Sequence, residues 1–186
     1  MVNFDRPIDC ISAFLNIAPT VGCWTTSNVI GIQKQWLSFN LDDPRTATGR
    51  RTVSYDKPMF ILNSYNTFTL KRGWQLELNS DFYSKAHYRN VRLLDNYWNL
   101  TAAVQKTLLR DKSLTVRLSC SDIFNTARHD ALLDLGNYTL YQSDVFGGER
   151  SHYSFHRVQL SLRYAFNATK SKYKGQGAGQ DIISRM

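Results

Sequence analysis

The sequence predicts an all-β protein, folded as an antiparallel up-and-down meander of about seven strands. Segments that alternate strictly between apolar and polar residues recur along the chain, and every second connection between them is short. An antiparallel meander gathers its short turns at one end, and transmembrane β-barrels share this contrast between short turns and long loops. No segment approaches the roughly 18 apolar residues of a spanning helix, so any crossing of a membrane is expected through strands.

The last predicted strand, residues 157–166, has the clearest alternation. Its other side chains are polar or small, as expected for a strand with lipid on one side and water on the other. The apolar side becomes more aromatic toward one end, as it does where a strand enters the membrane interface. We therefore expect the following side chains to face lipid: Val158, Leu160, Leu162, Tyr164 and Phe166.

Six further strands precede this one. They are predicted at residues 11–17, 24–37, 59–70, 74–82, 98–105 and 114–121, and Lys34 interrupts the apolar phase of the second. Short polar or Gly-containing turns are predicted at 18–22, 71–73 and 110–113. The longer connections fall at 39–56, 87–95 and 126–150.

Aromatic residues collect near both ends of the predicted sheet, as in the two girdles of a membrane barrel. Those near short turns or the end of the last strand are Trp24, Phe68, Trp74, Tyr164 and Phe166. Those near the longer loops are Trp36, Tyr83, Tyr97, Trp98, Phe124 and Phe155.

Composition indicates one domain over residues 1–166, followed by a polar, basic and Gly-rich segment, 167–186, that we expect to be a flexible tail. The net charge is +8, but Lys and Arg are scattered, so nucleic-acid binding is not expected. The three cysteines lack metal-ligand spacing. Residues 1–7 lack the features of a secretory signal.

Several motifs, taken together in their order, resemble the C-terminal barrel portion of TonB-dependent outer-membrane receptors, specifically the outer-membrane β-barrel family common in Bacteroidetes. Ser121-Asp122-Ile123-Phe124-Asn125 is similar to the family's Asn/Asp-Leu-Phe-Asn element at the top of a late strand. Further similar segments are the strand end Tyr164-Ala165-Phe166, residues 18–24 and 33–36, and the tail residues 170–175 and 177–179.

The resemblance implies a large transmembrane β-barrel that takes up a ligand across the Gram-negative outer membrane. Such a barrel is energised by the inner-membrane TonB complex through an N-terminal plug. The plug, the signal peptide and most strands of a roughly 22-stranded barrel are absent from this sequence, so we expect a C-terminal fragment that does not transport alone. Its partners would be outer-membrane lipid and the assembly machinery that recognises the last strand, with TonB engaged through the missing N-terminal parts.

No nucleophile motif or dinucleotide loop is present, so neither an enzyme nor a bound cofactor is expected. His87 and His129 fall in predicted loops, with Asp130 and Asp134 near the second, and we expect solvated loop residues rather than a metal site. The loop 126–150 is the candidate for ligand contact, with an unpartnered mobile cap as the alternative. Its aromatic residues are Tyr138, Tyr141 and Phe146.

The rival interpretation is a soluble lipocalin-like carrier of small ligands. Gly22-Cys23-Trp24 is similar to the Gly-x-Trp near the start of lipocalins, and the length suits an eight-stranded barrel. Lipocalins place apolar residues inside the barrel and have no reason to gather aromatic residues in two bands. The membrane barrel is therefore preferred.

Overall fold

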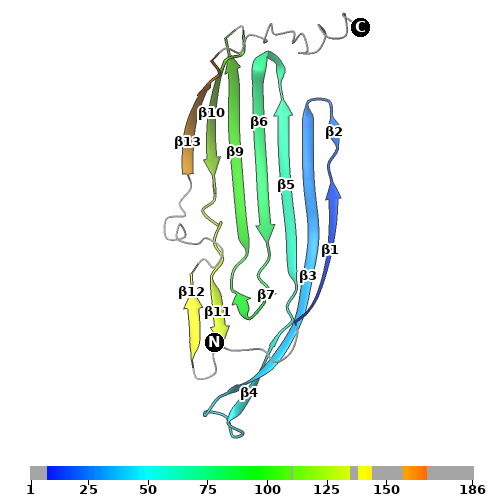
Figure 1. Cartoon of the computed structure of the whole chain (residues 1–186), viewed down its shortest axis with the longest axis vertical. Coiled ribbons are helices and arrows are strands. Elements are labelled where there is room, and N and C mark those ends of the chain that lie inside the picture. Colours follow the sequence, from blue (N-terminus) through cyan, green and yellow to red (C-terminus); the bar gives the residue numbers. More distant parts are fainter. Residues whose placement is uncertain (1–7, 110, 135–137, 144–156, 167–186) are drawn as a thin grey trace, which may run out of the picture.

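The computed structural model describes residues 8–109, 111–134, 138–143 and 157–166, and it is all-β (Figure 1). Seven strands form the path of a long antiparallel sheet, as the sequence predicted, in the order β1-β3-β5-β6-β9-β10-β13. They are β1 Asp9–Ile17, β3 Trp24–Asp42, β5 Met59–Thr69, β6 Trp74–Tyr83, β9 Tyr97–Leu108, β10 Leu114–Ser121 and β13 Arg157–Tyr164. No helix in these ranges is long and apolar enough to cross a membrane.

The short connections lie together at one end of this sheet, the upper end in Figure 1. The two-residue strand β2, Thr20–Val21, pairs with the start of β3 across Gly22, whose φ of +60° suits glycine. The 3-10 turn η1, Lys71–Gly73, joins β5 to β6. The turn between β9 and β10 has positive φ values at Leu109 and Lys112. We call this the turn end, and the opposite end the loop end.

The long connection expected at 39–56 is corrected by the structure. Strand β3 continues to Asp42, and β4, Arg50–Tyr55, folds back along it in antiparallel register. Leu37 and Leu41 on β3 and Val53 and Tyr55 on β4 are all buried, so these alternating apolar residues form a cluster of their own. Burial of this cluster explains why the segment is a hairpin rather than an irregular loop.

The other two longer connections also contain strands that were not predicted. They form a four-stranded sheet of order β12-β11-β8-β7 at the loop end, which we call the cover sheet. Its strands are β7 His87–Tyr88, β8 Val91–Leu93, β11 Ala131–Asp134 and β12 Thr139–Gln142. The described residues at the loop end therefore include a second, smaller sheet.

The register of the long sheet sorts its side chains into two faces. One row of aligned positions crosses six strands, through Trp24, Phe68, Leu76, Val104, Leu118 and Leu160. The next row crosses the same strands through Thr25, Thr67, Glu77, Ala103, Ser119 and Gln159. Because successive side chains point to opposite faces, the first row belongs to what we call the apolar face and the second to the polar face.

Burial is uneven along the long axis. Both clusters of buried hydrophobic residues lie at the loop end, whereas large hydrophobic residues on the apolar face of all seven long strands are exposed. Strand β13 ends at Tyr164, two residues earlier than expected, and Phe166 beyond it is 84% exposed. The fold thus presents a broad apolar surface rather than a core beneath the sheet.

Candidate functional site

The polar face carries an ion pair between strands that are not direct neighbours. Arg117 on β10 places Nη2 2.6 Å from Oε2 of Glu77 on β6, across the intervening β9. Gln105 on β9 donates from its side-chain amide to Gln75 on β6 at 3.5 Å. These charged and amide groups lie within the long strands, where they require water or polar partners rather than lipid. This face therefore suits the interior of a barrel.

The apolar face includes the side chains that the sequence assigned to lipid on the last strand. Val158, Leu160, Leu162 and Tyr164 align with Cys120, Leu118, Val116 and Leu114 of β10. All four residues of β13 are more than half exposed, and Leu162 is 70% exposed. Strand β13 lies at the edge of the described sheet, and its alternation matches that of the strands beside it. That these four side chains of β13 contact lipid stays a prediction.

Aromatic residues at the turn end of the apolar face are held by specific contacts. Trp24 stacks on Phe68 at a centroid distance of 6.2 Å, and its Nε1 donates to Oδ1 of Asn66 at 3.0 Å. Trp74 lies under the ammonium of Lys106, which is 4.7 Å from the ring centroid. These rings have the apolar body and polar edge contact that suit a membrane interface.

The loop end of the same face has its own aromatic group. Trp98 packs against Phe124 at 5.0 Å, and its Nε1 donates to the Ser80 hydroxyl at 2.9 Å. Trp36 lies under Lys34 at 5.0 Å. This contact explains how β3 accommodates Lys34, which interrupted the apolar phase of the sequence.

Two aromatic residues expected in the girdle at the loop end are placed differently by the structure. Tyr83 and Tyr97 are aligned on neighbouring strands, and their rings meet at 5.6 Å on the polar face. Both rings also contact the buried imidazole of His129. The girdle assignment is corrected for these two residues, because their alternation points them away from the apolar face. Phe155 lies outside the described residues.

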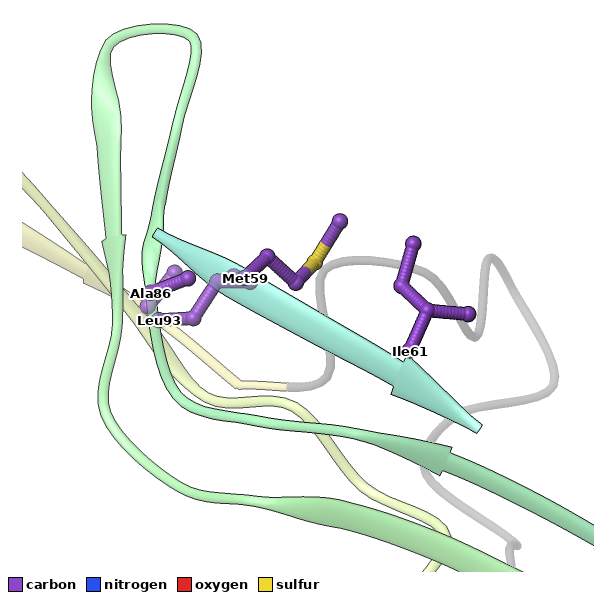
Figure 2. Close-up of a cluster of buried hydrophobic side chains, with 5 residues drawn as sticks. Met59, Ile61, Ala86 and Leu93 are labelled. Carbon is purple, nitrogen blue, oxygen red and sulfur yellow. The ribbon is translucent and has the colours of Figure 1, made fainter. Parts of the chain in front are cut away.

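The cover sheet packs on the polar face at the loop end. Met59 and Ile61 of β5 belong to one buried cluster with Ala86, Leu93 and Ala131, and Figure 2 shows Met59 next to Ala86 and Leu93. Since Met59 and Ile61 share the polar face with the Glu77 row, the cover sheet lies over the side that we assign to the interior. It therefore covers part of the polar face at the loop end.

A pair of hydrogen bonds fixes the tip of the β7–β8 hairpin. The side-chain amide of Gln35 on β3 donates to the Arg89 carbonyl at 2.6 Å and accepts from the Arg89 backbone amide at 2.7 Å. Arg89 has φ +51° in this tight turn. Gln35 is buried. Its two hydrogen bonds with Arg89 therefore replace those that water would otherwise make with the side-chain amide.

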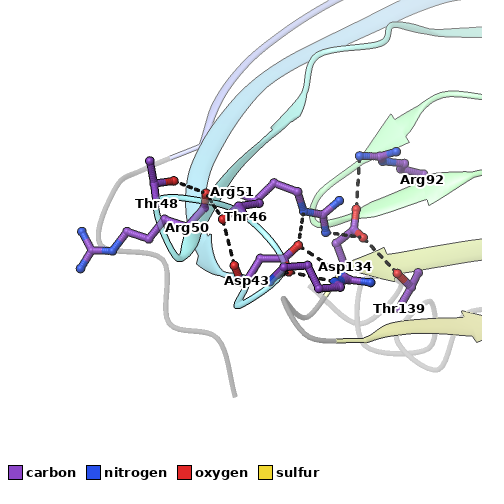
Figure 3. A network of polar contacts seen from close by, with 9 residues as sticks. Asp43, Thr46, Thr48, Arg50, Arg51, Arg92, Asp134 and Thr139 are labelled. Atoms are coloured by element: carbon purple, nitrogen blue, oxygen red, sulfur yellow. Dashed lines mark hydrogen bonds and ion pairs between the residues drawn. The ribbon is translucent and has the colours of Figure 1, made fainter.

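An ion network joins the β3–β4 hairpin to the cover sheet (Figure 3). The Asp134 carboxylate on β11 lies 3.2 Å from Nη2 of both Arg51 on β4 and Arg92 on β8. The Thr139 hydroxyl donates to the same carboxylate at 3.2 Å. Arg51 also lies 3.6 Å from the buried Asp43, which Arg45 contacts at 2.9 Å. Hydrogen bonds from Arg45 hold the pKa of Asp43 below its usual range.

The aromatic residues of the candidate ligand loop differ in their placement. Tyr138 is exposed, and Tyr141 on β12 is exposed but donates its hydroxyl to the buried Asp130 carboxylate. That bond raises the pKa of Tyr141. Asp130 also pairs with Arg128 at 3.2 Å. Phe146 lies outside the described residues. Both described tyrosines therefore have exposed rings, and the hydrogen bond to Asp130 holds that of Tyr141 in place.

The motif Ser121-Asp122-Ile123-Phe124-Asn125 forms a hydrogen-bonded turn at the end of β10. Asp122 and Asn125 both have positive φ, a conformation that Asp and Asn tolerate better than other side chains. The Asp122 carboxylate accepts from the backbone amides of Thr126 at 2.9 Å and Ala127 at 3.1 Å. The Asp122 amide in turn donates to Asn99 on β9 at 3.1 Å. The turn therefore directs the chain from β10 into the cover sheet.

The histidines and acids expected in solvated loops are largely ordered. His129, Asp130 and Asp134 are buried, which corrects the expectation of solvated residues. His87 accepts from the backbone amides of Asp56 and Lys57 through Nδ1, at 2.9 and 3.1 Å. Burial, reinforced by Arg92, lowers the pKa of His87. Within the ranges that the structure describes, no three His, Cys, Asp or Glu side chains are grouped as a metal site requires.

Residues 10–164 match the family model described as outer membrane protein beta-barrel family. The chain belongs to this family. No curated protein and no solved structure matches the chain. Membership agrees with the all-β antiparallel architecture, and the matched range runs from β1 to the end of β13. An outer membrane barrel has an apolar band outside and polar side chains inside, and the long sheet likewise has one apolar and one polar face.

Sequence reasoning missed several residues that organise the loop end of this barrel segment. Arg51 and Arg92 gave no signal at the level of motifs, and Asp134 was noted only as an acid near His129, because the three residues are far apart in the chain and meet only in the folded cover sheet. Gln35 likewise reads as an ordinary polar strand residue. The alternation of Val53 and Tyr55 was the available signal for β4, and it is a short one.

Proposed function

We propose that the chain forms part of the wall of a TonB-dependent receptor in the outer membrane of a Gram-negative bacterium, of the type common in Bacteroidetes, and that it has no enzymatic activity. The observation that carries this proposal is the division of the long sheet into two faces. Exposed apolar residues cover one face, whereas the other carries the Arg117–Glu77 ion pair.

The energetics of the two faces favour a membrane over water. Exposed residues such as Ile30, Leu62, Leu78 and Leu118 extend the apolar surface across the sheet, on either side of the hydrogen-bonded polar side chains of Asn28, Ser64 and Asn66. Exposed apolar surface of this extent is unusual on a soluble monomer. Lipid removes this surface from water without any further protein layer. A lipocalin-like carrier would bury its apolar face inside the barrel, so this arrangement favours the membrane wall.

The loop end supports a receptor rather than a simple anchor. The cover sheet lies on the polar face, and Tyr138 and Tyr141, beside and on its strand β12, are both exposed. Ordered loops on a rigid barrel commonly carry binding residues. The resemblance of Ser121-Asp122-Ile123-Phe124-Asn125 to the receptor element adds to this, since that segment leads into the cover sheet.

Transport by this chain alone is not proposed. Among the described residues, β1 and β13 each pair on one side, so the sheet has two open edges. Unpaired backbone groups do not face lipid in a stable membrane protein. Further strands are therefore required, with the assembly machinery acting on β13 and TonB acting through segments outside this sequence.

Adjacent residues on opposite faces provide the test of the wall. In a Cys10→Ser, Cys23→Ser background of the natural protein, the native Cys120 is compared with Ser119→Cys in a Cys120→Ser chain. Cells are treated with a membrane-impermeant maleimide. We expect labelling at position 119 and none at Cys120 until the membrane is dissolved. Equal labelling of both thiols in intact membranes would contradict the assigned faces.

The receptor assignment has a separate test. Cells that express the natural protein are treated with formaldehyde in the presence and absence of TonB. A cross-linked species of the natural protein that requires TonB is the expected result. Correct labelling of the faces without any TonB-dependent species would retain the membrane wall and remove the receptor assignment.

A further inference from the structure

An apolar groove of about 620 Å³ lies on the apolar face, between the centre of the sheet and the turn end. Small side chains, Ala102 and Cys120, align with each other on neighbouring strands and lie at its floor. Larger side chains surround them: Phe68, Leu78, Leu118 and Val158. The depression therefore arises because two small residues sit within a row of large ones.

Cationic residues lie beyond the groove, toward the turn end. Lys106 is on the same face of β9 as Ala102 and Val104, two residues beyond Val104. Its ammonium lies over Trp74. Its Nζ also donates to the carbonyl of Arg72. The adjoining turns contain Lys71, Arg72 and Lys112. Among the described residues of these turns, Asp111 is the one acidic side chain. The turn end thus carries an excess of positive charge next to the apolar groove.

We propose that this groove and Lys106 form a binding site for one anionic glycerophospholipid, with an acyl chain along Ala102 and Cys120 and the phosphate at Lys106. The site rests on the proposed function, because it requires the apolar face to meet lipid. Trp74 and Trp24 mark the height of the membrane interface, where a headgroup lies. Lys side chains at that height attract anionic headgroups.

The structure favours a lipid over a peptide as the occupant. A strand that docks on a sheet requires a free backbone edge, but β6, β9 and β10 beneath the groove are each paired on both sides. The groove offers no backbone donors or acceptors to a peptide, and its lining side chains are almost wholly apolar. A hydrocarbon chain needs no hydrogen bonds, and an anionic headgroup accounts for the cations at one end.

The chain contains a matched control for each part of the site. Lys34 lies over Trp36 on the same face, as Lys106 does over Trp74, but at the loop end and away from the groove. Ala13 is exposed on the apolar face of β1, where it aligns with Ile32. Lys106→Gln and Ala102→Leu therefore change the site, whereas Lys34→Gln and Ala13→Leu repeat each substitution elsewhere.

The experiment extracts the natural protein and its four variants from outer membranes in mild detergent. Each is exchanged into nanodiscs of phosphatidylcholine with a small fraction of phosphatidylglycerol, and the phosphatidylglycerol that remains bound is counted by native mass spectrometry. We expect one retained molecule in the parent, Lys34→Gln and Ala13→Leu. Lys106→Gln should lower retention about five-fold, as expected for one cation near a membrane surface, and Ala102→Leu should abolish it.

The outcomes separate this site from the proposed function. Equal retention in all five proteins, or equal loss in Lys34→Gln and Lys106→Gln, overturns the site while the membrane wall stands. If the parent does not fractionate with the outer membrane, both the wall and the lipid site are overturned. Retention that is lost in Ala102→Leu but unchanged in Lys106→Gln overturns the headgroup contact.

Discussion

Arg51 on β4 lies 3.2 Å from the Asp134 carboxylate on β11, although the two residues are 83 positions apart in the chain. This contact joins the β3–β4 hairpin to the cover sheet, which also adjoins the long sheet through the buried cluster around Met59 and through the hydrogen bonds between Gln35 and Arg89. The carboxylate is 8% exposed, whereas Arg51 is 36% exposed. The acid is therefore the member of the pair that most depends on its partner.

Replacement of Arg51 with alanine is expected to destabilise the cover sheet. Breaking a fully buried ion pair costs about 3–5 kcal/mol, and the partial exposure of Arg51 together with the remaining Arg92 contact reduces this to about 1–2 kcal/mol. Hydrogen exchange of the β8 and β11 amides measures the change. Arg50→Ala is the control, because Arg50 and Asp42 are both exposed at 3.8 Å. Equal protection in the two variants would contradict the role of Arg51.

Asp122→Ala is expected to lower the free energy of unfolding by about 2 kcal/mol. Alanine is poorly suited to the positive φ at this position, and the amides of Thr126 and Ala127 lose their acceptor. Asp122→Asn should cost less than about 1 kcal/mol, since asparagine tolerates this conformation and retains an acceptor oxygen. Urea unfolding in lipid vesicles compares the two. The same loss in both variants would show that charge, rather than turn geometry, matters.

Leu162→Arg is expected to destabilise the membrane-inserted sheet by roughly 2–4 kcal/mol, as expected for arginine on the lipid side near the bilayer centre. Leu160→Arg should behave similarly. Ser161→Arg, at the adjacent position on the polar face, should have a mild effect. The measurement is the urea midpoint of the natural protein in vesicles. Equal shifts for Leu162→Arg and Ser161→Arg would show that β13 does not have one side toward lipid.

Acidification is expected to loosen the β4–β7 junction through His87. Burial lowers its pKa, so the unfolded state binds the proton more readily than the folded state. The contribution of His87 is therefore full above the unfolded pKa of about 6.5 and is lost as the pH falls below it. Arg92 and Lys57 lie near the ring and oppose protonation, whereas Asp56 at 3.9 Å favours it.

The pH dependence is measured as the urea midpoint between pH 7.5 and pH 5. His87→Gln is the matched variant, because glutamine offers an acceptor to the Asp56 and Lys57 amides but does not titrate. We expect this variant to depend less on pH than the parent. An identical pH profile in the two proteins would assign the acid sensitivity to other groups.

The long sheet was predictable because alternation is a local signal. Leu76 and Leu78 on β6, or Leu160 and Leu162 on β13, identify a strand and its faces without any knowledge of neighbours. The short turns were predictable for a similar reason, since Gly22 and Gly73 mark them directly. The resemblance to an outer-membrane β-barrel family was confirmed by the family match over residues 10–164, whereas the receptor role stays a proposal.

The cover sheet was not predictable from the same signals. Its strands have two to four residues, too few to establish a period of two. Tyr83 and Tyr97 were assigned to the girdle because position along the strand was considered without the face, and alternation places them against His129. Asp134 depends on Arg51 and Arg92, and such distant pairings leave no local pattern.

The number of long strands has a consequence for how the wall closes. Each strand on the path from β1 to β13 is antiparallel to the next, and there are seven of them. The two outermost strands therefore run in the same direction, and joining them directly would create a parallel seam. A ring of identical copies with one orientation in the membrane would have the same seam at every junction. Closure by antiparallel pairing throughout requires an odd number of additional strands between β13 and β1.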